Sequence, residues 1–186
     1  MPRTTIPLAL VVAGVGAFAA APGQRPSGVE KAPRQDEVEV HLIDRQGQHA
    51  GTAILKAEAE GVSIQLEVSG LPPGPKGIHL HETGSCEPPA FESAGSHLNP
   101  DGKQHGLENP QGPHLGDLPN LGVDADGNAE TTIEVRDAML TGDDPKALLK
   151  PGGTALVIHA QADDNRTDPS GDSGDRLVCG VIEAAE

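Results

Sequence analysis

The sequence contains no tyrosine and no tryptophan, and its two phenylalanines are Phe18 and Phe91. Proteins that bind nucleic acid attract its phosphates with positive charge and often stack its bases on aromatic side chains. This chain has a formal net charge of −15 over 186 residues and almost no aromatic surface to offer. We therefore exclude nucleic acid as a partner, and we expect an aliphatic core.

Long apolar runs are also scarce, and the longest lies near the N-terminus at residues 6–21. It is shorter than the roughly 20 residues that a membrane-spanning helix needs. It follows Arg3, and Ala17-Phe18-Ala19 has the small-x-small pattern of a signal-peptidase site. We predict a signal peptide at residues 1–19, with an uncleaved anchor as the alternative. Residues 20–35 mix proline, glycine and charge without apolar periodicity, which predicts a flexible linker.

A signal peptide implies an exported protein, periplasmic or extracellular, with no stable membrane span after cleavage. The sequence has two cysteines, Cys86 and Cys179. In an oxidising compartment an even number of cysteines favours disulfide pairing, so one disulfide is the simplest interpretation. Two buried free thiols are the alternative.

Most of the chain beyond residue 36 alternates apolar and polar residues, as half-buried β-strands do. The clearest case is the segment 62–68. Similar segments occur at 38–42, 53–57, 77–81, 154–159 and 177–183, and two more flank a predicted hairpin turn at 124–127. These strands predict one all-β domain at 36–186, an eight-stranded antiparallel β-sandwich or flattened barrel.

Two long stretches, 83–118 and 161–175, do not alternate in this way. Loops of this length inside a compact domain are usually functional, so we predict two long functional loops. The only helical signal is weak and predicts a short helical turn at 145–149.

Histidine is abundant where other aromatic residues are missing, since the chain has eight. His79 and His81 form an H-x-H on a predicted strand, which places both imidazoles on one face. The first long loop adds four more candidate metal ligands, and a later strand ends in another. These five are His97, His105, His114, Asp117 and His159.

Six histidines and one aspartate are three ligands too many for one four-coordinate site and one too few for two. They divide into two sites of four if one imidazole donates through both ring nitrogens to two cations. A site of four imidazoles suits Cu(II), and a site of three imidazoles and one carboxylate suits Zn(II). His41 and His49 match neither set, so we predict them to be ordinary surface or strand histidines.

The segments around these residues resemble the copper/zinc superoxide dismutases, in particular the bacterial exported members. The resemblance extends from about Val38 to Glu183, and its motifs occur in the family's order and near its spacing. They are Gly77–Glu82 (GIHLHE), Ser93–Pro100 (SAGSHLNP), His105–Gly106, His114–Leu118 (HLGDL), Leu156–Ala160 (LVIHA), Ala162–Asp164 (ADD) and Gly171–Ile182 (GDSGDRLVCGVI). It implies Greek-key connections between the strands, and one copper and one zinc ion per subunit.

The resemblance also assigns roles to individual residues. It implies that copper is bound by His79, His81, His97 and His159, and that zinc is bound by His97, His105, His114 and Asp117. His97 is then the bridge, and Asp163 links a copper-ligand histidine to a zinc-ligand histidine. Arg176 corresponds to the guanidinium that docks the anion, and Cys86–Cys179 corresponds to the family's disulfide.

The implied activity is dismutation of superoxide, with copper alternately reduced and reoxidised, in protection of the cell envelope. His97 would take up and return a proton in each cycle, so His97 and Arg176 are the predicted catalytic residues. The alternative of another class is a metal-buffering protein on the same fold. Since the segment 86–97 is longer than in cytosolic eukaryotic members, the familiar dimer does not follow, and a homodimer stays open.

The second long loop holds five aspartates and one cation, Arg166. Its net charge would repel superoxide, so attraction must come from the metals, from Arg176, or from Lys103 or Arg166. We therefore expect a weak dependence of the rate on ionic strength.

Overall fold

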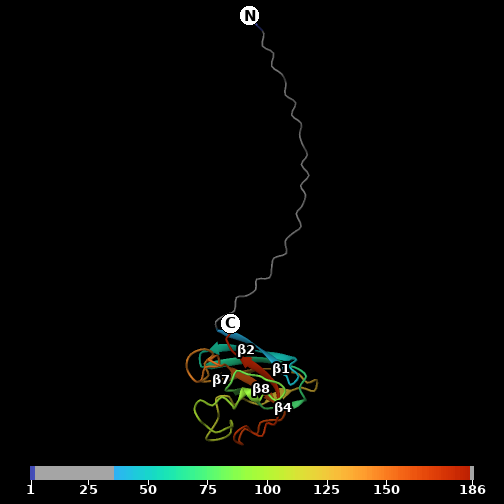
Figure 1. Cartoon of the computed structure of the whole chain (residues 1–186), viewed down its shortest axis with the longest axis vertical. Helices are drawn as coiled ribbons and strands as arrows, with labels where there is room; N and C mark the ends of the chain where they lie inside the picture. The colour runs from blue at the N-terminus through green and yellow to red at the C-terminus, as the bar shows by residue number, and fades with distance from the viewer. Residues whose placement is uncertain (3–35, 185–186) are drawn as a thin grey trace. The chain divides into compact units, whose positions relative to one another are not determined.

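A computed structural model describes residues 1–2 and 36–184 of the chain (Figure 1). The predicted linker at 20–35, and all of the predicted signal peptide except its first two residues, lie outside the described residues. Among the residues that are described, no helix is both long enough and apolar enough to cross a membrane.

The described part of the chain forms nine strands and one short 3₁₀ helix. They are β1 (Glu37–Asp44), β2 (His49–Glu58), β3 (Gly61–Val68), β4 (Gly74–Lys76), β5 (Ile78–His81), η1 (Glu92–Ala94), β6 (Leu121–Val123), β7 (Ala129–Arg136), β8 (Thr154–His159) and β9 (Arg176–Ile182). Seven strands form one antiparallel sheet in the order β5-β8-β9-β1-β2-β3-β7, and β4 pairs with β6. The sheet curls around the core, which confirms the all-β sandwich or barrel (Figure 1).

The alternation of side chains sets the register of the sheet. On β3, Val62, Ile64 and Leu66 are buried while Gln65 and Glu67 are exposed. A one-residue slip would turn the apolar set toward water, so the pairing with β2 and β7 is strongly specified. Both ladders run unbroken, with Ile64 opposite Leu55 on β2 and Ile133 on β7.

The structure differs from the sequence-based expectation in the short elements. There are nine strands rather than eight, because the sequence pattern does not predict the short strand β4, which pairs with β6 in a small sheet of its own. The turn at 124–127 is present, with the N–H of Asp124 donating to the carbonyl of Asn128, but β6 pairs with β4 and not with β7. At 145–149 the structure has hydrogen-bonded turns and no helix: the N–H of Ala147 donates to the carbonyl of Asp144 at 2.9 Å, and Ala147 forms an isolated bridge with Met139.

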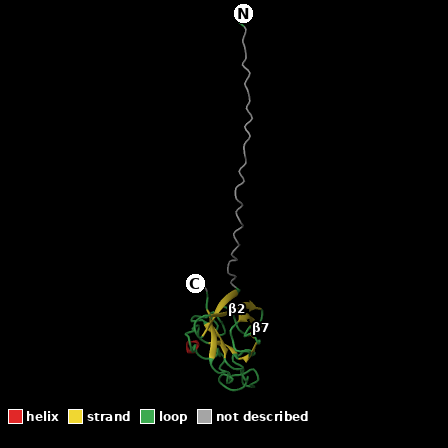
Figure 2. Cartoon of the chain, turned by 90° about the vertical axis from the view of Figure 1, so that its right-hand side faces the viewer, coloured by secondary structure: helices red, strands yellow, loops and turns green. Residues whose placement is uncertain are grey.

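The two predicted long loops are confirmed and lie against each other at one end of the sheet (Figure 1). Figure 2 shows that loops, and not strands, make up this end of the domain. The N–H of Glu108, in the first loop, donates to the carbonyl of Asn165 in the second at 3.0 Å. The N–H of His105 donates to the carboxylate of Asp168 at 2.7 Å. Because the loops share these hydrogen bonds, each one limits the movement of the other.

A disulfide joins the start of the first loop to β9. Cys86 and Cys179 are bonded, with a Cα–Cα distance of 5.7 Å, so the predicted disulfide is confirmed. Phe91 is fully buried and packs with Cys179 and Val157 in a small second core on the outer face of the sheet. The loop is therefore fixed to β9 by a covalent bond and by apolar packing.

Candidate metal centre

Three buried histidines project from the paired strands β5 and β8. His79 and His81 lie two residues apart on β5, and His159 is the last residue of β8. Together with His97 from the first loop, their ring nitrogens all lie within 4.8 Å of one another. We call these four residues the strand group.

A second group lies in the first loop, and we call it the loop group. Its members are His97, His105, His114 and Asp117, whose ligand atoms also lie within 4.8 Å of one another. The loop is held against β5 by isolated bridges that pair His81 with His97 and His79 with Asp117. His97 belongs to both groups, so the two share one imidazole.

Hydrogen bonding leaves one free nitrogen on each histidine of the strand group. Among the described residues, His79 Nδ1 and the Nε2 atoms of His81, His97 and His159 are buried without a partner. The Nδ1–H of His81 donates to the carbonyl of Gly95 at 3.0 Å, and that of His159 donates to Gly174 at 3.2 Å. A buried unpaired polar atom costs about 1–3 kcal/mol, so four in one place indicate a site for an ion. Four imidazole nitrogens suit copper.

The loop group converges on one carboxylate oxygen. Asp117 Oδ1 lies 2.9 Å from Nδ1 of His97, 2.9 Å from Nδ1 of His105 and 3.2 Å from Nδ1 of His114. The other oxygen, Oδ2, accepts hydrogen bonds from the N–H groups of Gly106 and His114, which fix the carboxylate. Three imidazoles and one carboxylate form a donor set that fits tetrahedral zinc.

Asp163 connects the two groups from behind. Its Oδ2 lies 2.6 Å from Nε2 of His79, and its Oδ1 lies 3.0 Å from Nε2 of His105. These nitrogens are on the far side of each ring from the nitrogens that face the two groups. Asn120 holds Asp163 in place, with its side-chain amide bonded to both the N–H and the carbonyl of Asp163 at 2.8 Å.

The space behind Asp163 is closed by a glycine. Gly171 adopts a φ of +62°, and a Cβ there would overlap the carboxylate of Asp163 and approach the ring of His105. Glycine is the residue that combines this backbone conformation with the absence of a side chain. Its backbone therefore packs directly on the carboxylate that orients the two rings.

The two groups differ in their protonation. Burial lowers the pKa of His81 to about 2 and the pKa of His159 to about 3. Burial also lowers the pKa of His105, but the hydrogen bonds that its ring donates to the carboxylates of Asp117 and Asp163 outweigh it and raise the pKa to about 9. Burial raises the pKa of the Asp117 carboxyl, but its hydrogen bonds with His105 and His97 outweigh this and hold that pKa well below its usual range. Without metals, His81, His97 and His159 are neutral at pH 7, whereas His105 in the loop group holds a proton beside Asp117.

Arg176 lies beside the strand group, at the start of β9. Its two terminal nitrogens donate to backbone carbonyls of the first loop, Nη1 to Phe91 at 2.6 Å and Nη2 to Gly95 at 2.7 Å. The Gly95 carbonyl also accepts the bond from His81. Arg176 is half-buried, so its guanidinium is fixed in orientation while part of it stays accessible.

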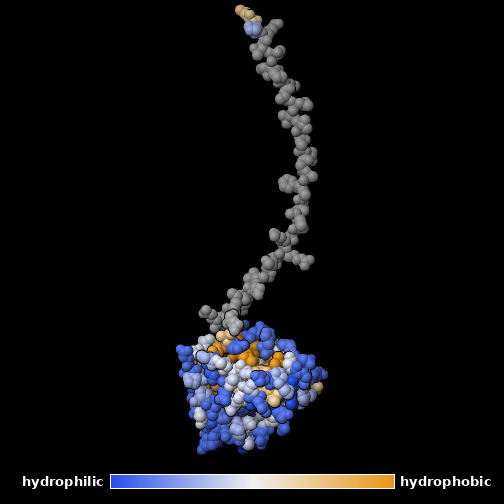
Figure 3. Space-filling view, viewed as in Figure 1, coloured by the Kyte–Doolittle hydropathy of each residue, from blue (hydrophilic) through white to orange (hydrophobic). Residues whose placement is uncertain are grey.

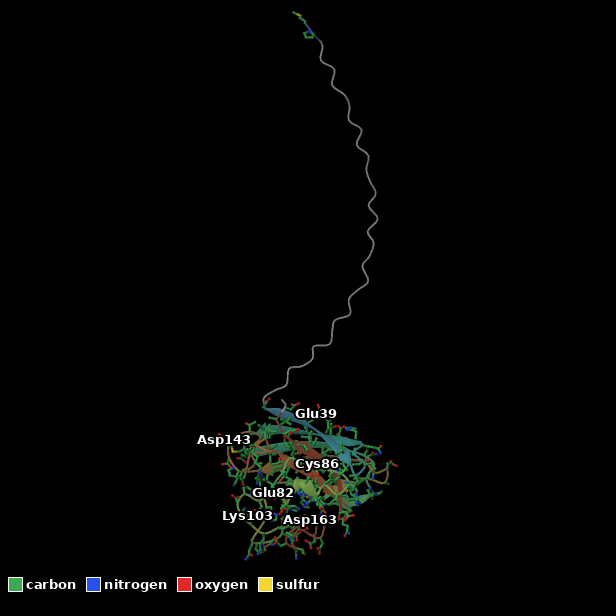
Figure 4. All side chains as sticks on the ribbon, viewed as in Figure 1. Glu39, Glu82, Cys86, Lys103, Asp143 and Asp163 are labelled. Carbon is green, nitrogen blue, oxygen red and sulfur yellow. A yellow bond between two sulfur atoms is a disulfide. The ribbon has the colours of Figure 1, made fainter. Side chains whose placement is uncertain are left out.

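The charges of the second loop are largely paired or exposed. Arg166, one of the cations that could attract an anion, forms a two-point ion pair with Glu108 through Nε and Nη2. Arg45 on the neighbouring turn pairs with Asp175 at 3.3 Å. The expectation that Arg166 adds free positive charge is therefore weakened. Lys103 is exposed on the first loop and remains a candidate (Figure 4).

Comparison with known proteins agrees with this geometry. The family model described as copper/zinc superoxide dismutase matches residues 49–182. This chain belongs to the copper/zinc superoxide dismutase family. The activity of this family is superoxide dismutation, and its two cofactors are copper and zinc. The strand group and the loop group offer the ligands for two such ions.

Relatives cover most of the chain. It is 46% identical over 142 residues to superoxide dismutase [Cu-Zn] 2 of Aquifex aeolicus, which covers 76% of this chain and 83% of that protein. It is 38% identical over 184 residues to the superoxide dismutase-like protein YojM of Bacillus subtilis, covering 94% of each. Among solved structures, the Cu/Zn superoxide dismutase from Brucella abortus has a TM-score of 0.63 and 28% identity, covering 80% of this chain and all of that one. An SOD-like protein from Bacillus subtilis has a TM-score of 0.75 and 43% identity, covering 77% and 97%.

The structure brings together all the residues that the sequence predicted for the two metal sites. It also places Asp163 and Arg176 beside them and leaves His41 and His49 outside. Sequence reasoning missed Asn120 and the backbone carbonyls of Gly95 and Gly174. No sequence signal identifies these groups, because they contact the site through long-range folding and largely through main-chain atoms.

Proposed function

We propose that the strand group binds copper, that the loop group binds zinc, and that His97 bridges the two ions during dismutation of superoxide. Two superoxide anions and two protons then give one dioxygen and one hydrogen peroxide. The observation that carries this assignment is the shared ring of His97. Its Nδ1 faces Asp117 at 2.9 Å, and its Nε2 is a buried unpaired atom of the strand group.

Copper, when bound, supplies the one-electron chemistry, taking an electron from one superoxide and giving one to the next. The protein relays a proton taken from solvent and orients the ligands. His97 is suited to hold a proton at Nε2 in one half of the cycle and to release it toward the peroxide product in the other. Asp163 keeps His79 and His105 in fixed orientations, because the Nε2–H of each ring donates a hydrogen bond to one of its two carboxylate oxygens.

Arg176 binds the incoming anion in this proposal. Its guanidinium is charged at every physiological pH and has a fork of five N–H donors, of which two groups are anchored on Phe91 and Gly95. The remaining donors can face a small anion without taking part in electron transfer. The anchoring lowers the entropy cost of binding, because the side chain is already ordered.

The cellular setting is part of the same proposal. Residues 1–19 would direct export and be removed, residues 20–35 would be a linker, and the enzyme would act in the periplasm or outside the cell to protect the envelope. The Cys86–Cys179 disulfide supports this setting, because disulfides persist in oxidising compartments. N-terminal sequencing of the protein from a periplasmic fraction tests it, and a mature chain that still begins at Met1 would contradict it.

The activity is tested with the copper- and zinc-loaded protein and with Arg176→Ala. We expect dismutation well above that of free copper, and a loss of about tenfold or more in Arg176→Ala, within the range of electrostatic effects on association. Arg166→Ala is the matched control, since it removes the same side chain from the second loop, where Glu108 pairs with it. A loaded protein no faster than free copper would overturn the proposal in favour of metal buffering.

A further inference from the structure

Two histidines that the metal centre does not use lie close together on the outer face of the sheet. His41 is on β1 and His49 begins β2, and both are exposed. Their neighbours Val40 and Leu42 point into the core, so His41 points outward. The two rings have centroids 6.2 Å apart and are inclined by 65°.

The register of the sheet sets this separation. His41 is opposite Thr52, and His49 is opposite Ile43, two residues further along the strand of His41. A β-bulge between Leu42 and Ile43 shifts the pairing at that point. The two imidazoles are therefore diagonal neighbours across one ladder, at positions that the backbone holds constant.

The separation of the rings is compatible with a shared ion. With metal–nitrogen distances of about 2.0 Å, two imidazoles on one ion have centroids up to roughly 6 Å apart. The metal centre itself provides an internal reference. Pairs within the strand group have centroids from 4.0 Å, for His79 and His97, to 6.4 Å, for His79 and His81. The His41–His49 pair falls inside that range.

Several acidic residues lie around the pair, beside the apolar Val38, Ile43 and Val181 that line the same groove as His41. Glu39, two residues before His41, lines the same groove as His41, together with Glu37 and Glu183. His49 lines a neighbouring groove with Glu67 and Asp124. Figure 4 shows Glu39 well apart from Asp163, so this face is separate from the metal centre. Carboxylates near two imidazoles attract a divalent cation and offer additional oxygen ligands.

We propose that His41 and His49 form a second, surface metal site that binds one Cu(II) ion through two imidazole nitrogens. Cu(II) is favoured over other divalent first-row ions by nitrogen ligands, and water or a nearby carboxylate completes its coordination. The site is open to solvent, so it binds and releases its ion without any movement of the loops. This proposal does not depend on the assignment of the strand and loop groups.

The test uses the holoprotein with its copper and zinc sites filled, titrated with Cu(II) in the presence of glycine as a weak competitor. We expect one further equivalent of Cu(II) to bind, with an electron paramagnetic resonance spectrum distinct from that of the first. His41→Gln, His49→Gln and the double variant should each weaken this binding by about tenfold or more, because a single imidazole loses the chelate advantage. Dismutase activity should be unchanged in all three, which also shows that they fold.

Glu130→Gln is the matched control, because it removes one of the negative charges that line the groove of His49 while keeping both histidines. It should weaken the binding far less than either histidine variant. The proposal is overturned if the holoprotein takes up no additional Cu(II). It is equally overturned if the histidine variants bind it as tightly as the unmodified protein, since carboxylates alone would then hold the ion.

Discussion

The strand group and the loop group share His97, yet the fold builds them in different ways. His79, His81 and His159 stand on two paired strands, where sheet register fixes their spacing. His105, His114 and Asp117 stand on a loop, where hydrogen bonds to Asp117 and to the second loop hold them. A site on strands is positioned by the core of the protein, whereas a site on a loop depends on its own polar contacts.

The two groups also differ in hydrogen bonding and protonation when no metal is bound. The strand group presents four unpaired buried nitrogens, and burial keeps His81 and His159 neutral. The loop group compensates for its missing cation with a proton, since the pKa of His105 is raised to about 9 between Asp117 and Asp163. In the proposed assignment, copper therefore binds nitrogens that have no other partner, whereas zinc displaces a proton from His105.

The largest effect is expected from removing the residue that the two groups share. His97→Ala takes one ligand from each site. The affinities for zinc and for copper should therefore both fall by more than the roughly 10–100-fold that is typical when a residue contacting a ligand is removed. Dismutation should fall in parallel. Metal analysis and the visible spectrum of copper measure this, and Gln65→Ala, on the exposed face of β3, serves as the surface control. A copper spectrum unchanged in His97→Ala would contradict the bridge.

Asp163→Asn should lower the metal affinity of the loop group more than that of the strand group. The amide keeps the size of the side chain but cannot accept a hydrogen bond from both rings. We expect the zinc affinity to fall by about 10–100-fold, because His105 has no strand to hold it. The copper affinity should fall less, because His79 is also held by β5. Chelator competition for each metal is the measurement, and equal losses would show that sheet register does not position His79.

Proton release should also differ between the groups. When zinc alone is added to the metal-free protein at pH 7, we expect about one proton to be released, because zinc needs the neutral ring of His105. The release should fade as the pH rises through about 9, where that ring is already neutral. Copper alone should release fewer protons at pH 7, because His81 and His159 are neutral there. Calorimetry in buffers of different ionisation enthalpy counts the protons, and equal counts would remove the distinction.

The smallest effect is expected from salt. Arg166 is paired with Glu108, Arg45 is paired with Asp175, and the second loop is acidic, so long-range attraction of superoxide is weak. Raising the ionic strength to about 0.15 M, where the Debye length is about 8 Å, should change the rate by less than about twofold. Stopped-flow rates over a salt series measure this. A steep loss of rate would mean that long-range steering by exposed charges such as Lys103 outweighs the short-range attraction of Arg176.

Much of this structure could be predicted from the sequence, and the reasons are local. The alternation at 62–68 specifies β3, and the ligand types with their spacing identify both metal groups. The short strand β4 could not be predicted, because three residues carry too little periodicity and one of them is a proline. The 3₁₀ helix at Glu92–Ala94 depends on the packing of Phe91 below the disulfide, which is a long-range effect.

The supports of the site were the least predictable part. Asn120 is 43 residues from Asp163 in the sequence, and its role appears only when the fold brings the two together. The carbonyls of Gly95 and Gly174 are main-chain atoms that every residue has, so no residue type marks them. A sequence therefore identifies ligands better than it identifies what orients them.

The position of the Arg176 side chain depends on the backbone path of the first loop and not on which side chains that loop exposes. Both of its anchors are main-chain carbonyls, at Phe91 and Gly95. Residues 87–90, which lead into Phe91, are exposed. The exposed side chains of residues 87–90, including any that antibodies or proteases recognise, can therefore vary in evolution while Arg176 keeps its position. The same residues are a natural place for an engineer to attach a label.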